Sequence, residues 1–206
     1  MIDLPVIAAA AATCLAGVVS PGPNFLAVSH RATTSASREA LGMAIGIALV
    51  NVLWSALALF GMGMVIARLP GGLSALGYAG AAYLVWIGSR QLVHSRRAAF
   101  DPMNSRARTS SGRAILQGMG TNLSNPKSMV FYASVFTGAV PAGTSPPTLL
   151  VLVAVVGLLA FGWYGSLALA LSRPRIAKAF ESRRKMVERC CGVLLVAVGL
   201  RQAIGS

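Results

Sequence analysis

The sequence predicts an all-α membrane protein, and three observations support this fold class. Of the 206 residues, 55% are hydrophobic and only 11% are charged, whereas a soluble domain carries roughly 25% charged residues. Apolar runs long enough to cross a bilayer, about 20 residues each, recur too often along the chain to be buried in one soluble core. Lys and Arg, which give the chain a net charge of +13, lie mainly in the gaps between these runs.

The apolar runs predict six transmembrane helices within a single integral membrane domain that covers residues 1–206. We expect the helices at about 4–28, 41–67, 73–93, 114–139, 147–171 and 187–204. The first run lacks the basic segment that precedes the apolar part of a signal peptide. We therefore interpret it as the first membrane helix.

The positions of Lys and Arg predict the orientation of the chain. Fifteen of the 18 lie in the first, third and fifth loops, and cytoplasmic loops carry such an excess. Both termini are therefore expected outside, with a long basic cytoplasmic loop at about 94–113. A basic chain can also bind nucleic acid, but no basic face of a soluble fold is predicted here, so we exclude that partner. The loop residues are Arg31 and Arg38; Arg90, Arg96, Arg97, Arg106, Arg108 and Arg113; and Arg173, Arg175, Lys178, Arg183, Arg184, Lys185 and Arg189.

The two halves of the chain resemble each other. Gly-Ser-Arg-Gln at 88–91 corresponds to Gly-Leu-Arg-Gln at 199–202, and Trp54 corresponds to Trp163. Three crossings in each half would place the halves in opposite orientations, which is the inverted repeat of many secondary transporters. We predict two three-helix units, at about 1–93 and 114–206.

The first apolar run is interrupted by Ser20, Pro21, Gly22, Pro23 and Asn24. A proline inside a helix costs roughly 3 kcal/mol, so this segment cannot continue the helix. Backbone groups freed within a membrane must be satisfied by protein or by a water-filled cavity. The break therefore predicts a site.

The fourth run contains a matching break, with Asn122, Asn125, Pro126 and Lys127. A cation at the centre of a bilayer costs about 3 kcal/mol, and such residues usually face a cavity or a partner. The alternative is a shallow Lys127 that reaches the headgroups, but the neighbouring asparagines favour a polar site.

The two breaks together predict a binding site for an amino acid. Pro23 and Pro126 suit the first turn of a restarted helix, whose free N–H groups attract an anion. With Lys127 they would bind a substrate carboxylate. Carbonyl groups near 17–19, with Asn24 and Asn125, would accept hydrogen bonds from the substrate ammonium.

Other polar and small residues leave several interpretations open. None of the acids Asp3, Glu39, Asp101, Glu181 and Glu188 lies in the middle of a run. Proton coupling would therefore use Lys127, the substrate itself, Glu39 or Glu188, and a uniporter stays open. Small residues let membrane helices approach closely, and Gly42 and Gly46 are expected to pack within the chain, with a homodimer contact as the alternative. Cys14, Cys190 and Cys191 are interpreted as small packing residues, because they show no metal-ligand spacing.

These motifs resemble those of the LysE/RhtB family of amino-acid exporters. The segment 20–23 resembles the family's PGP motif, 122–127 its NPK motif, and 37–42, 80–84 and 192–201 its second, third and last helices. The resemblance implies secondary active efflux of an amino acid or a derivative across a bacterial inner membrane, driven by the proton-motive force. It carries over Pro21, Gly22, Pro23, Asn125, Pro126 and Lys127 as motif positions, with no cofactor and no enzymatic activity.

Three other functions compete with this one. A metal-ion exporter would need membrane carboxylates, histidines or thiolates, and the breaks contain none. A thiol-redox carrier would need cysteines in both broken helices. A membrane subunit without transport activity would show no substrate flux in a folded protein.

Overall fold

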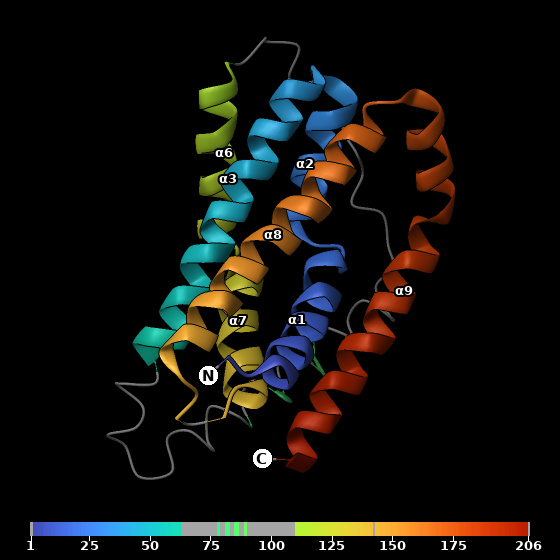
Figure 1. Cartoon of the computed structure of the whole chain (residues 1–206). Coiled ribbons are helices and arrows are strands. Elements are labelled where there is room, and N and C mark those ends of the chain that lie inside the picture. Colours follow the sequence, from blue (N-terminus) through green and yellow to red (C-terminus); the bar gives the residue numbers. More distant parts are fainter. Residues whose placement is uncertain are drawn as a thin grey trace.

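The described part of the computed structural model is helical, with no strand among its residues (Figure 1). It comprises residues 2–62, 78, 81–82, 85–86, 89, 110–141 and 143–205. The helices are α1 (Leu4–Val19), α2 (Pro23–Thr34), α3 (Ser37–Ala56), the π-helical turn η1 (Leu57–Met62), α6 (Ser111–Leu123), α7 (Pro126–Ala139), α8 (Pro146–Leu171) and α9 (Pro174–Gly205).

Proline sets the start of most of these helices. Pro23, Pro126, Pro146 and Pro174 are the first residues of α2, α7, α8 and α9. Proline suits the first helical position, because a backbone N–H at that position has no carbonyl partner within the helix. No hydrogen bond is therefore lost when proline lacks this group. The predicted breaks at Pro23 and Pro126 are confirmed: α1 and α2 meet at 56°, and α6 ends three residues before α7 begins.

Several predicted bounds were wrong in the polar segments. Helix α2 continues to Thr34 and α3 starts at Ser37, so Arg31 is helical and only a short turn separates the two helices. The basic segment expected as the fifth loop forms the first half of α9. Arg, Lys and Glu are good helix formers. A prediction that places helices only in apolar runs does not detect a helix made of these residues.

Two helices among the described residues are long and apolar enough to span a membrane, Ser37–Gly61 and Pro146–Leu171. The bent pair α1 and α2 makes a third if it counts as one span. The predicted helix at 73–93 and the loop at 94–113 fall largely outside the described residues, although Tyr78, Ala81, Ala82, Val85, Trp86 and Ser89 are helical. The six-helix inverted repeat stays a prediction.

Helix α3 packs against α2, α6, α7 and α8. Its contact with α6 brings the two backbones together. A Cβ on Gly46 would lie 2.0 Å from the carbonyl oxygen of Ile115, and one on Gly118 would lie 2.2 Å from that of Met43. Gly42 faces Ser111 on the same helix, α6. The glycines therefore pack within the chain as predicted, and their face is not available for a homodimer.

The two chain ends lie at one end of the bundle, and the α2–α3 and α8–α9 junctions lie at the other (Figure 1). Cys14 is buried in the core, as expected of a packing residue, but Cys190 is exposed on α9.

Candidate functional site

The two helix breaks meet in the structure, and Lys127 connects them. Its ammonium Nζ donates to Ser20 Oγ at 2.8 Å, to the Ser20 carbonyl at 3.2 Å and to the Pro21 carbonyl at 3.3 Å. The last carbonyls of a helix have no partner within it and carry its negative dipole end. Lys127, from the first turn of α7, therefore neutralises the end of α1 across the bundle.

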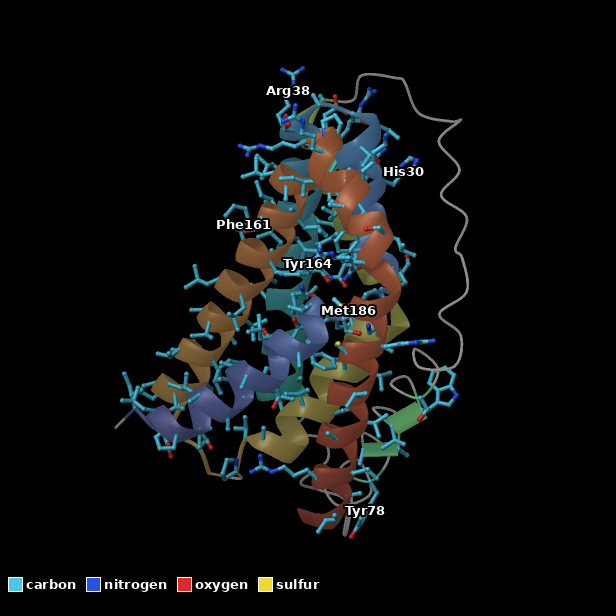
Figure 2. The ribbon with its side chains drawn as sticks, turned by 90° about the vertical axis from the view of Figure 1, so that its right-hand side faces the viewer. His30, Arg38, Tyr78, Phe161, Tyr164 and Met186 are labelled. Atoms are coloured by element: carbon cyan, nitrogen blue, oxygen red, sulfur yellow. The ribbon has the colours of Figure 1, made fainter. Side chains whose placement is uncertain are left out.

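A small cavity of about 20 Å³ lies at this junction. This volume holds roughly one water molecule. Tyr164 lies about halfway along the bundle, between Arg38 and His30 at one end and Tyr78 at the other (Figure 2). The lining residues are Gly17, Val18, Ser20, Gly22, Asn24, Asn51, Asn125, Lys127, Ser128, Phe131, Tyr132 and Tyr164.

The N-termini of α2 and α7 differ in their capping. Asn125 caps α7, since its Oδ1 accepts from the Lys127 backbone N–H at 3.1 Å. Helix α2 starts after Gly22 and has no side-chain cap. The Lys127 ammonium is 3.3 Å from the position of a Gly22 Cβ. Positive charge and the positive dipole end of α2 are thus close together.

A buried amide network supports the cavity. Asn122 is fully buried, and its Nδ2 donates at 2.8 Å to both the Ile47 carbonyl and Asn51 Oδ1. Its Oδ1 accepts from Asn24 Nδ2 at 2.9 Å. The Asn122 side chain therefore joins α2, α3 and α6.

Two buried polar atoms next to the cavity have no hydrogen-bond partner among the described residues. They are Asn24 Oδ1 and the Tyr132 hydroxyl. Tyr164 lies near enough to Asn24 to interact with it, but not in hydrogen-bonding geometry with Oδ1. A buried acceptor without a donor costs roughly 1–3 kcal/mol, so a ligand that supplied N–H groups here would remove that cost.

The structure brings most of the predicted site residues together. Ser20, Gly22, Asn24, Asn125 and Lys127 line the cavity, and the Pro21 carbonyl contacts Lys127. Pro23 and Pro126 begin α2 and α7. Asn122 does not line the cavity and instead positions Asn24 and Asn51.

Sequence comparison assigns the chain to a family. The model of the LysE type translocator family matches residues 15–206. The chain belongs to the LysE family. It is 27% identical over 194 residues to a threonine efflux protein of Salmonella typhi, covering 92% of this chain and 93% of the relative. It is 26% identical to the threonine efflux protein of Escherichia coli K12, covering 92% and 93%.

The chain also matches one further relative over a shorter length. The chain is 38% identical over 96 residues to a homoserine/homoserine lactone efflux protein of Salmonella typhi, covering 46% of this chain and 41% of the relative. No solved structure matches the chain.

Sequence reasoning missed part of the cavity wall in this LysE family member. Asn51, Ser128, Tyr132 and Tyr164 all line the cavity. Asn51 is a buried amide within an apolar run, and intramembrane polar residues are a functional signal. Asn51 was not predicted as a site residue because its apolar run contains no proline and therefore no helix break.

A second buried polar cluster lies where α2, α3 and α6 meet. Arg31 Nη1 is 3.6 Å from Glu39 Oε2, with side-chain exposures of 11% and 1%, and Arg31 Nη2 donates to Gln117 Oε1. The interpretation of Arg31 as a loop residue was wrong, because α2 carries it into the protein. Glu39, proposed above as a proton-carrying group, is paired with Arg31.

Proposed function

We propose that this LysE family member exports an amino acid or an amino-acid derivative, and that the cavity between the two broken helices is its substrate site. The observation that carries the proposal is the meeting of a lysine from a broken apolar run, an uncapped helix N-terminus and unpaired buried acceptors at one point. The names of the threonine and homoserine efflux relatives support the substrate class.

The substrate carboxylate would bind between the Lys127 ammonium and the N-terminus of α2. Both are positive, and a helix N-terminus without a cap presents free N–H groups to an anion. In the structure the ammonium donates to the carbonyls of Ser20 and Pro21. A carboxylate would compete with these carbonyls for the same three protons.

The substrate ammonium would bind at Asn24 Oδ1 and the Tyr132 hydroxyl. Both atoms are buried without partners in the described structure, and both residues line the cavity. Asn125, also predicted for this role, already uses its Oδ1 to cap α7. The ammonium contact therefore falls to Asn24.

Transport would follow from the two breaks. A cavity of about 20 Å³ is several times too small for any amino acid, so substrate entry requires the helices at the breaks to move apart. We propose secondary active transport across a bacterial inner membrane, driven by the proton-motive force, with both termini outside and the two halves as an inverted repeat. In that arrangement the site lies near the midplane, where secondary transporters bind their substrates.

The test is flux in proteoliposomes that contain the purified protein. Labelled threonine, homoserine, lysine and homoserine lactone would be measured with and without an imposed proton gradient. The Lys127→Ala variant would be compared with Arg183→Ala, which removes an exposed cation of α9. The expected result is saturable flux in the parent and in Arg183→Ala, and a loss of at least 10-fold in Lys127→Ala, about 1.4 kcal/mol.

Three outcomes would contradict parts of the proposal. Equal flux in Lys127→Ala and in the parent would refute the proposed substrate site but would leave the proposed substrate class unchanged. If the folded protein transported no amino acid, the proposed substrate class would be refuted, and divalent metal ions would then be tested as the alternative substrate. Flux without dependence on the gradient would replace secondary active transport by a uniporter.

A further inference from the structure

A second and larger cavity lies on α2, away from the substrate site. It is a groove of about 660 Å³ between α2 and the α8–α9 junction. Its apolar lining residues are Phe25, Leu26, Ala32, Leu171, Pro174, Ala177 and Phe180. The rings of Phe25 and Phe180 pack with centroids 5.4 Å apart, so one wall joins α2 to α9.

A hydroxyl group in this groove lacks a partner. Ser29 lines the groove, is only 7% exposed, and its Oγ makes no hydrogen bond within the described part of the chain. The other two hydroxyls of the lining are satisfied, since Thr33 donates to the Ser29 carbonyl and Ser172 to the Ala168 carbonyl. A buried hydroxyl without a partner is unfavourable, so Ser29 indicates a polar ligand group.

The charge of the groove has one sign. Arg175 and Lys178 line it, both from the first turns of α9, and no acidic residue is present among the lining residues that the structure describes. Both side chains are exposed. The groove lies toward the end of the bundle where Figure 2 shows Arg38 and His30. Apolar walls below a cationic rim match a hydrocarbon chain below an anionic headgroup.

We propose that this groove binds one anionic phospholipid of the adjacent leaflet. Its phosphate would contact Arg175 and Lys178, its ester region would accept from Ser29, and an acyl chain would lie along Phe25, Leu26 and Phe180. Basic pockets between membrane helices bind anionic headgroups. The groove volume of about 660 Å³ is far larger than an amino acid needs, and most of the lining side chains are apolar. The inference depends on the bilayer alone and not on amino-acid export.

The experiment is native mass spectrometry of the full-length protein, titrated with phosphatidylglycerol or phosphatidylcholine after delipidation. The test variant is Arg175→Gln/Lys178→Gln. The matched control is Arg183→Gln/Arg189→Gln, which removes two exposed charges from the same helix outside the groove. Thr33→Trp, at an exposed lining position, would fill the groove without removing a charge.

One phosphatidylglycerol is expected to bind the parent and the control variant with the same affinity. At about 1 kcal/mol for each cation near an anionic headgroup, the test variant should bind roughly 30-fold more weakly, and Thr33→Trp should also bind more weakly. Any of four results would overturn the proposal: equal binding of phosphatidylcholine, unchanged binding in both the test variant and Thr33→Trp, displacement of the lipid by inorganic phosphate alone, or displacement by millimolar threonine. Displacement by phosphate would make the groove a free-anion site, and displacement by threonine would make it a substrate entrance.

Discussion

Replacement of Gly17 by alanine tests how closely the two broken helices must approach. Gly17 lies in the last turns of α1, and a Cβ there would be 2.0 Å from Cζ of Phe131 on α7. Ordinary contacts begin near 3.4 Å, so the ring or the helices must shift by more than an ångström. Inserting a methyl group into a packed core costs about 1–3 kcal/mol. Because both residues line the cavity, the same shift would change the proposed substrate site.

The assay is thermal unfolding of purified protein in detergent, beside threonine flux in proteoliposomes. At about 2–4 °C per kcal/mol for a chain of this size, Gly17→Ala should lower Tm by roughly 2–12 °C and reduce flux. Gly162→Ala on α8, where a Cβ would meet nothing within 4 Å, should have no such effect. Gly17→Ala/Phe131→Leu should recover at least about 1 kcal/mol relative to the sum of the single variants. A Gly17→Ala protein with the Tm and flux of the parent would refute the contact.

Three further variants test the packing around the site. Asn122→Ala removes three buried hydrogen bonds and should lower stability by about 1–3 kcal/mol, measured as Tm; an unchanged Tm would mean that water replaces the amide. Glu39→Ala leaves the Arg31 guanidinium without its carboxylate and should lower the free energy of unfolding by about 3–5 kcal/mol. The double variant Arg31→Met/Glu39→Met should recover most of this loss. Equal Tm values for the single and double variants would argue against the ion pair. Gly118→Ala would place a Cβ 2.2 Å from the backbone of α3 and should abolish monodisperse protein in size-exclusion chromatography, while Gly120→Ala, which meets nothing within 4 Å, should not.

The breaks and the lysine could be predicted from the sequence because each violates a rule that holds locally. Proline cannot continue a helix, so Pro23 and Pro126 determine two helix starts without any knowledge of the fold. A cation within an apolar run requires a partner, and this was enough to place Lys127 in a polar site. These inferences need only the identity of a residue and its immediate neighbours.

The partners of these residues could not be predicted, because they depend on how the helices cross. Lys127 was expected to face a ligand, and its bonds in the structure to carbonyls of a segment more than 100 residues away were not foreseen. Asn51 and Tyr164 reach the cavity only because α3 and α8 pack beside the breaks. Arg31 appeared to be a loop cation because its neighbours are polar, but in the structure it is buried against Glu39 and Gln117. Neither the spacing of apolar residues along the chain nor its composition carries information on such long-range pairs.

The position of Lys127 has a consequence for the transport cycle. Its ammonium is at once the partner of the freed carbonyls at the end of α1 and the proposed partner of the substrate carboxylate. Those carbonyls cannot lose their donor within a membrane unless water or substrate replaces it. A carboxylate that draws Lys127 away would therefore weaken the link between α1 and α7. Substrate binding and separation of the two broken helices are then one event, so an empty site would keep its helices together and a bound one would release them.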